Sequence, residues 1–307
     1  MGTLLAVLLL CGDAVEVRRD DAQGRLQVLV DGREAFAYLY GKDLDLPHFY
    51  PVRSPSGRPM TVQRTDPYPH HRSFWFADDV QLEGKRKASF YNAWYSGKDR
   101  KDPAPPFRDR IRHVEFLPDR AGEGRAELGM KLLWEIDEGV AVLDEQRTVR
   151  VVSLGKGEYF LDMTFAVTAS YGDAKFVSDA VHYAWPYLRM DGAFTPKGGG
   201  VLVNSEGGEG QAGTHGKAAR WVDYSSAGDG AEGLAFLVHP ESGPSPKWLT
   251  RDYGTFGPRR PDERSGKPFV LRKGESLRQR VGILVHRGDA RAGVVEERYR
   301  RYAEGKL

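Results

Sequence analysis

Apolar and polar residues alternate in short runs along most of this chain. The run Tyr159–Ala169 shows the pattern best, with Phe160 and Asp162 on one face. Leu161 and Met163 fall on the other face. A period of two is that of a β-strand whose two sides meet different surroundings. We therefore predict a strand here that separates an apolar layer from a second, more polar one.

Similar runs recur between clusters of Gly, Pro, Asp and Ser. Asp31-Gly32 lies between two of these runs, which predicts a β-hairpin. The predicted strands are Ala14–Arg18, Arg25–Val30, Glu34–Tyr40, Ile111–Leu117, Gly124–Glu135, Ala141–Ser153, Tyr159–Ala169, Val201–Asn204, Ala218–Tyr224, Gly233–His239, Phe269–Leu271 and Ser276–His286.

One segment has a helical period instead. Within Ala290–Lys306, the residues Val294, Val295, Arg298 and Tyr302 fall at helix-like spacing. About a dozen strands and one short helix predict an all-β fold, a large antiparallel β-sandwich with a C-terminal helix. Similar predicted strands lie on both sides of every Pro-rich or Gly-rich loop, so we expect residues 14–307 to form a single domain.

Composition narrows the function classes. The chain has 45 Lys and Arg against 43 Asp and Glu, so it has no basic excess of the kind that binds nucleic acid. Its one cysteine, Cys11, leaves no internal disulfide and no multi-cysteine zinc site.

Residues 1–13 begin with an apolar run that is too short to span a membrane. The run resembles the apolar part of a secretory or lipoprotein signal, although the positively charged region that precedes it in such signals is missing. We expect export to the periplasm or the cell exterior, and a cytoplasmic chain is the alternative.

The segment from Pro67 to Phe76 is the densest in functional residue types. His70 and His71 can each bind a metal or move a proton near neutral pH. Arg72 can hold a carboxylate, and the Trp75 ring can stack on a sugar. Neighbours in a strand face opposite sides, so we expect only one of the two histidines to enter a pocket.

Three further groups of candidates follow along the chain. Glu145 and Arg147 share a strand face, where they either bind hydroxyl groups or form an ion pair within the sheet. His182 lies in an aromatic-rich stretch. A strand end and the following loop carry the fourth group, which is His239, Trp248, Arg251 and Tyr253.

Aromatic rings beside His, Arg and Glu suit a small polyhydroxylated ligand or an oligosaccharide. We predict a carbohydrate-active protein that needs no cofactor or metal, with proton transfer between a histidine and Glu145. Epimerase, lyase and hydrolase chemistry on a sugar or keto-sugar all fit. A non-catalytic sugar-binding module is one alternative. A metal-dependent oxygenase or hydrolase, with His70 or His71, His182 and His239 as ligands, is another.

Several of these segments resemble a bacterial family known as DUF6807, some of whose members carry the label methane oxygenase PmoA. The resemblance rests on Pro69-His70-His71-Arg72, on Glu145-x-Arg147 and on the stretch from His239 to Gly254. It covers most of the chain and implies a fold similar to the galactose-mutarotase-like supersandwich. The methane-oxygenase label would require long apolar spans, which this sequence lacks.

One departure from the family pattern concerns a metal site. Members usually have Asp-His before Pro-His-His, whereas Pro67-Tyr68 stands there in this chain. If the Asp-His pair supplies a ligand in the family, this protein lacks that ligand.

Overall fold

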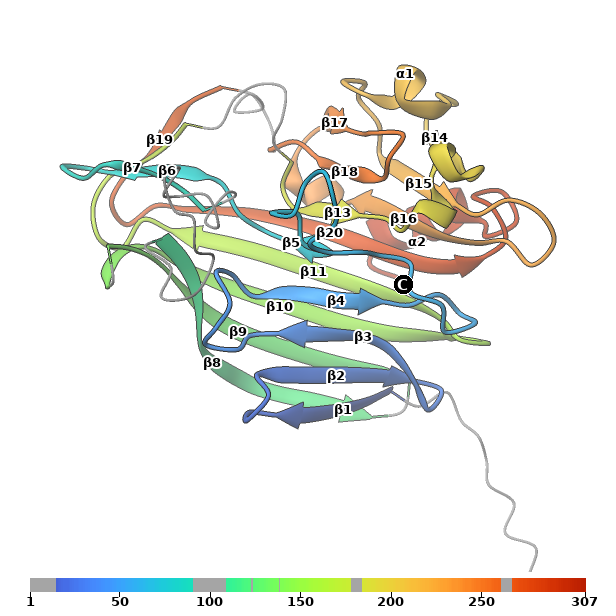
Figure 1. The fold of residues 1–307 in the computed structure, drawn as a ribbon, viewed down its shortest axis with the longest axis horizontal. Coiled ribbons are helices and arrows are strands. Elements are labelled where there is room, and N and C mark those ends of the chain that lie inside the picture. The colour runs from blue at the N-terminus through green and yellow to red at the C-terminus, as the bar shows by residue number, and fades with distance from the viewer. Residues whose placement is uncertain (1–14, 91–108, 123, 138, 178–183, 261–266) are drawn as a thin grey trace, which may run out of the picture.

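The computed structural model describes residues 15–90, 109–122, 124–137, 139–177, 184–260 and 267–307. Residues 1–13, with the predicted signal, lie outside the described residues, and so does His182. Within the described residues the strands form three sheets whose neighbouring strands are antiparallel (Figure 1). The chain is thus mostly β-stranded, as predicted.

We call the first sheet the N-terminal sheet. In spatial order it contains β1 (Val15–Asp20), β2 (Arg25–Val30), β3 (Arg33–Leu39), β4 (His48–Val52), β5 (Phe74–Trp75), β13 (Tyr187–Arg189), β18 (Thr255–Pro258) and β17 (Trp248–Leu249).

The second sheet, which we call the long sheet, lies behind the first in Figure 1. Its order is β14 (Val201–Asn204), β15 (Trp221–Ser225), β16 (Glu232–Val238), β20 (Ser276–Arg287), β11 (Glu158–Thr168), β10 (Val140–Gly155), β9 (Arg125–Ile136) and β8 (Asp109–Gly122).

A small third sheet lies at one end of the sandwich. It consists of β19 (Phe269–Leu271), β12 (Ala174–Phe176), β6 (Asp79–Leu82) and β7 (Lys87–Ser89). The helical elements are α1 (Gly210–Thr214), α2 (Val295–Ala303) and the short 3-10 turns Gly192–Phe194, Pro196–Gly198 and Pro240–Ser242.

The predicted hairpin between β2 and β3 is confirmed. Val30 pairs with Arg33, so the connection has two residues. Asp31 and Gly32 have φ angles of 51° and 74°. Two consecutive positive φ angles are what the favoured two-residue hairpin turn requires, and glycine adopts them at no steric cost.

The two faces of β11 meet different layers, as its alternation predicts. Leu161 and Met163 are buried in the core between the N-terminal and long sheets. Phe160 points the other way and packs against the Tyr302 ring of α2, with 5.0 Å between ring centroids. The helix therefore covers the outer face of the long sheet, behind it in Figure 1.

The C-terminal helix is confirmed, but it is shorter than predicted. Residues 290–294 form turns, and Val294 has a left-handed backbone with a φ of 46°. The helix begins only at Val295. Among the described residues, no helix has the length and apolar character needed to cross a bilayer.

Candidate functional site

Three short strands in the middle of the N-terminal sheet present side chains to its outer face. Phe74 of β5 points into the core, with its ring centroid 5.9 Å from that of Phe236 in the long sheet. Alternation then turns Trp75 outward. Tyr187 of β13 lies directly opposite Trp75, and their rings stack 4.8 Å apart. Both rings are nonetheless buried.

The next outward pair extends this surface toward β18. Arg189 lies opposite Thr255, and its guanidinium donates a hydrogen bond of 3.0 Å to the Thr255 hydroxyl. That hydroxyl lies 3.2 Å from Nδ1 of His71. The sheet thereby fixes the orientation of one imidazole.

Both histidines belong to a turn and not to a strand. Residues 66–67 and 69–70 form turns, and the His71 amide donates to the Tyr68 carbonyl at 2.9 Å. The His70 and His71 rings meet edge to face, with centroids 4.6 Å apart. The expectation that they face opposite sides of a strand is therefore wrong, because a turn brings consecutive side chains together.

Two tyrosines complete the group. Tyr68 stacks on His71 at 4.9 Å and on Tyr253 at 5.2 Å between centroids. The Arg189 guanidinium lies 4.4 Å from the Tyr253 ring centroid. We name the set of outward side chains the histidine–aromatic cluster: Tyr68, His70, His71, Trp75, Tyr187, Arg189, Tyr253 and Thr255.

A glycine holds Tyr253 in this position. Gly254 has a φ of 95°, and a Cβ added there would lie 2.7 Å from the Thr195 side chain and 3.0 Å from Met190. Only glycine fits such a backbone at this distance. The sharp turn before β18 thus depends on Gly254.

Burial keeps both imidazoles uncharged. Burial, and then the Arg72 charge, lower the pKa of His70 to about 4. Burial, His70 and the charges of Arg189 and Arg72 lower the pKa of His71 to about 3. At neutral pH both rings therefore have a nitrogen that can accept a proton. Burial also raises the pKa of Tyr253, which keeps its hydroxyl protonated.

Arg72, predicted to contact substrate, instead holds the turn in place. Its side chain is fully buried and donates a hydrogen bond of 2.6 Å to Asp45. It also donates to the carbonyls of Pro69 and His70, at 3.3 and 3.0 Å. Arg72 is therefore a positioning residue for the two histidines.

Glu145 and Arg147 lie inside the sandwich and away from the cluster. Their side chains are fully buried, and Nε of Arg147 donates to Glu145 at 2.8 Å. Trp134 donates to the other carboxylate oxygen at 2.9 Å. The Arg147 guanidinium lies 5.0 Å from the Phe165 ring centroid in the core. Of the two predicted possibilities, the structure contains the ion pair, which is buried between the sheets.

His239 lies on the opposite side of the molecule. Its ring packs on Tyr302 of α2 at 4.8 Å between centroids, and Nδ1 accepts from the Glu241 amide at 3.2 Å. Burial lowers its pKa as well. The predicted convergence of His239 and Glu145 with His70 and His71 is therefore wrong for the described residues.

Trp248 and Arg251 differ in their surroundings. Trp248 is buried in the core and donates its indole N–H to the Ala219 carbonyl at 2.8 Å, so it has no surface left for a ligand. Arg251 is half-buried and lies 3.1 Å from the His215 ring nitrogens. Its charge acts on the Tyr253 hydroxyl, which places it at the edge of the histidine–aromatic cluster.

The predicted metal ligands are only partly testable, because His182 lies outside the described residues. In the part of the chain that the structure describes, no three His, Cys, Asp or Glu side chains form a group that could hold a metal ion.

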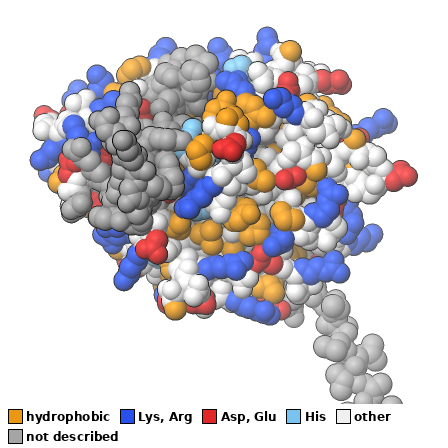
Figure 2. Space-filling view, viewed as in Figure 1, with side chains coloured by type: hydrophobic (Ala, Val, Ile, Leu, Met, Phe, Trp, Pro, Cys, Tyr) orange, Lys and Arg blue, Asp and Glu red, His pale blue; other side chains and the backbone are white. Residues whose placement is uncertain are grey.

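Figure 2 shows the face that contains the front of the N-terminal sheet. Hydrophobic side chains gather near its centre, histidine side chains lie at their margin, and Lys and Arg surround them. An apolar surface with polar groups at its edge is typical of ligand-binding regions.

The sequence pattern did not reveal four members of the cluster: Tyr68, Tyr187, Arg189 and Thr255. Tyr187-Leu188-Arg189 alternates an aromatic, an apolar and a cationic residue. That is a strand signal, but three residues are too few to establish a period of two.

Solved structures with a similar fold include carbohydrate-active enzymes. The GH36 α-galactosidase AgaA from Geobacillus stearothermophilus matches 91% of this chain with 9% sequence identity and a TM-score of 0.48. A polysaccharide lyase matches 90% with 14% identity and a TM-score of 0.42. The chain spans 41% of the galactosidase and 33% of the lyase.

A galactose 1-epimerase from Lactobacillus acidophilus NCFM matches in length as well. It covers 90% of this chain with 8% identity and a TM-score of 0.40, and the chain spans 99% of it. At these identities the likeness concerns the fold alone.

Among curated proteins, none matches the sequence. A family model described as a family of unknown function matches residues 25–300, which is most of the chain. None of these comparisons supports the methane-oxygenase label. The chain belongs to the DUF6807 family.

Proposed function

We propose that the histidine–aromatic cluster binds a carbohydrate and that His70 or His71 accepts a proton from it. Tyr68, His70 and Tyr253 are only partly buried, so each retains surface for a ligand. Aromatic rings cover the C–H faces of a sugar, and polar groups at their edges bond to its hydroxyls. The cluster offers both kinds of group on one face of the N-terminal sheet.

One observation carries the proton-transfer part of the proposal. Two uncharged imidazoles touch each other below the tyrosine rings, and the positive charges of Arg189 and Arg72 act on His71. An imidazole that is uncharged at neutral pH has a nitrogen that can accept a proton, and negative charge that develops on the ligand beside it strengthens that base. Positive charge nearby stabilises the negative charge that develops when a carbon beside a carbonyl loses a proton.

This arrangement favours epimerase or lyase chemistry over hydrolysis by two carboxylates. A glycosidase of that kind needs its two carboxyl groups about 5–10 Å apart on either side of the bond. Glu145, the carboxylate that the sequence suggested, is buried between the sheets instead.

The separation of Glu145 from the histidines also favours a second candidate, a sugar-binding module without turnover. Such a module needs the rings and polar groups but no acid partner for the base. The two functions differ in whether the protein moves a proton of the ligand. An enzyme speeds anomer interconversion or the exchange of a C–H bond with solvent, and a binding module does neither.

Proton exchange in heavy water separates these candidates. D-galactose, D-glucose, D-fructose and D-galacturonate would be incubated with the protein in D2O and followed by NMR. The proposal predicts faster anomer interconversion or deuterium uptake for at least one sugar, and its loss in His71→Gln. His239→Gln, which changes an uncharged histidine on the opposite side of the molecule, is the matched control.

Saturation transfer from protein to sugar without faster exchange would favour the binding module. If neither saturation transfer nor faster exchange occurs with any sugar, the proposal is wrong.

A further inference from the structure

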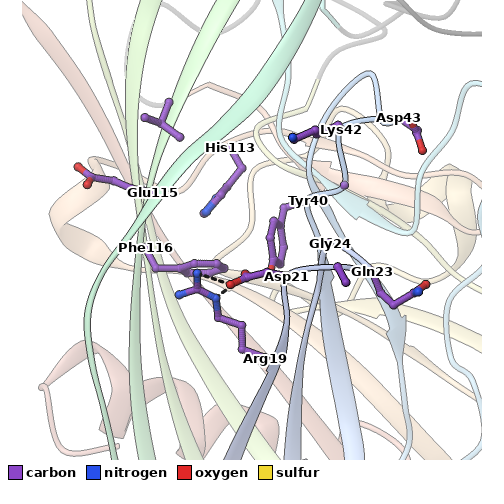
Figure 3. A pocket seen from close by; sticks show the side chains of 13 residues that line it. Arg19, Asp21, Gln23, Gly24, Tyr40, Lys42, Asp43, His113, Glu115 and Phe116 are labelled. Atoms are coloured by element: carbon purple, nitrogen blue, oxygen red, sulfur yellow. Dashed lines mark hydrogen bonds and ion pairs between the residues drawn. The ribbon is translucent and has the colours of Figure 1, made fainter.

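A cavity of about 870 Å³ lies at the open edge of the sandwich, apart from the histidine–aromatic cluster (Figure 3). It is enclosed by the β1–β2 turn, the loop after β3 and the strand β8. β1 and β8 are the edge strands of their sheets, so the cavity opens where the two sheets are not closed against each other. Its volume lies within the range of small-molecule sites.

A β-bulge in β8 shapes one wall. His113 pairs with Leu132 and Glu115 pairs with Lys131, so Val114 is an additional residue without a cross-strand partner. His113 and Phe116 are three residues apart, yet their ring centroids are only 4.3 Å apart. Bulges redirect side chains in this way and are frequent beside binding sites.

A ring from the opposite sheet faces this wall. The Tyr40 centroid lies 4.8 Å from that of His113 and 5.0 Å from that of Phe116. Figure 3 shows the Tyr40 and His113 side chains pointing toward the same space. Burial and the Arg19 and Arg147 charges lower the pKa of His113 to about 4, so its ring is uncharged at neutral pH.

Charged groups of both signs line the cavity, namely Arg19, Lys42, Asp21, Asp43 and Glu115. Arg19 donates two hydrogen bonds to Asp21, at 2.6 and 2.8 Å, and the Tyr40 hydroxyl donates to Asp21 at 2.7 Å. Lys42 and Asp43, which are exposed, extend from the loop above. A lining that mixes both signs of charge suits a neutral ligand with many hydroxyls better than an ion.

A cationic ligand fits less well. Aromatic cages bind quaternary ammonium groups through the faces of their rings. The Arg19 guanidinium already covers the Phe116 ring, 4.5 Å from its centroid. Positive charge from Lys42 nearby adds to this disadvantage.

We propose that this cavity is a second carbohydrate site, which takes a neutral sugar of one or two rings. Tyr40 and His113 stack against the sugar, and Arg19, Asp21 and Lys42 bond to its hydroxyls. The site lies between the edges of the two sheets, whereas the histidine–aromatic cluster lies on the outer face of one sheet. The two sites can therefore be tested separately.

The test uses a protein whose histidine–aromatic cluster is weakened by Tyr253→Ala. Lactose, cellobiose and maltose at millimolar concentration are the probes, and saturation-transfer NMR measures binding. Val114 is 49% exposed and lines the cavity, so Val114→Trp fills it without disturbing the core. Val201→Trp, at another exposed valine, is the matched control.

The proposal predicts that Tyr253→Ala still binds at least one probe. Adding Val114→Trp should weaken that binding about tenfold, which corresponds to ~1.4 kcal/mol. Adding Val201→Trp should leave it unchanged. If Val114→Trp lowers the melting temperature, Lys42→Ala replaces it, because Lys42 is exposed, and a weaker binding is again expected.

Two results would overturn this inference. One is that no probe binds to Tyr253→Ala, and the other is that the Val114 and Val201 variants bind equally. Binding that is lost in Tyr253→Ala but kept in Val114→Trp would overturn the second site and leave the proposed function intact.

Discussion

The Arg72 guanidinium and the Asp45 carboxylate form an ion pair of 2.6 Å from which solvent is excluded. Arg72 lies beside the two histidines, and Asp45 lies in the loop between β3 and β4. The pair therefore ties the histidine turn to the N-terminal sheet. Removal of one charge of a buried pair destabilises the folded state, because the other charge then stays desolvated without compensation.

Asp45→Asn should lower the free energy of unfolding by about 3–5 kcal/mol. The matched control is Asp173→Asn, since Asp173 pairs with Arg272, whose side chain is 69% exposed. That exposed pair should contribute far less to stability, because solvent screens it. Urea unfolding measures both values. If the two variants lose equal free energy of unfolding, the buried Arg72–Asp45 pair stabilises the fold no more than an exposed pair does.

The buried pair of Glu145 and Arg147 should contribute stability and not turnover. Glu145→Gln leaves the Arg147 charge uncompensated in the core, at a cost of about 3–5 kcal/mol in unfolding free energy. Adding Arg147→Met removes that charge and should restore most of the loss, while the introduced amide oxygen still accepts from Trp134.

Urea unfolding of the single and double variants measures this coupling. A stable Glu145→Gln protein that has lost turnover would instead support a catalytic role for Glu145.

Stability should fall as the pH drops from about 6.5 toward 4. Burial lowers the pKa of His48 and His70 to about 4 and that of His71 to about 3, whereas a histidine in an unfolded chain has a pKa of about 6.5. The unfolded state thus binds more protons in this window, so the stabilising contribution is full above it and is lost below it.

The His71→Gln variant tests this assignment. Each such histidine changes the unfolding free energy by up to about 1.4 kcal/mol per pH unit. His71→Gln should therefore lose less stability than the natural protein between about pH 7 and about pH 5. Identical pH profiles would show that His71 is not held uncharged by burial.

Tyr302 should be the residue that attaches α2 to the long sheet. It is fully buried and contacts both Phe160 and His239. Tyr302→Ala should cost about 3–5 kcal/mol, as other deletions of large core side chains do. Tyr302→Phe keeps the packing and removes only the hydroxyl bond of 3.3 Å to Asp162, so it should cost about 1 kcal/mol. A small effect of both variants would show that the helix is held elsewhere.

The long strands could be predicted because they repeat one pattern over many residues. β2 has the predicted bounds, and β11 differs by one residue at each end. β5 and β13 could not be predicted, because two or three residues do not define a period. Their pairing with each other depends on contacts between distant parts of the chain.

The candidate site was predictable only in part. The residue types around His70 and His71 marked the segment that carries the proposed site, but the partners of these residues depend on which face of a strand each side chain occupies. A shift of one residue turns every side chain of a strand to the other face. Glu145 is on the core-facing side of β10, which the sequence did not reveal.

The central claim is that a sugar binds at the histidine–aromatic cluster, and calorimetry on Tyr253→Ala tests it most directly. The titrant is the sugar that gives the strongest deuterium uptake or saturation transfer with the natural protein. The affinity should fall about tenfold in Tyr253→Ala, since one stacking ring is lost. It should stay unchanged in Tyr171→Ala, where the ring is 44% exposed and outside the cluster. Unchanged affinity in Tyr253→Ala would contradict the account.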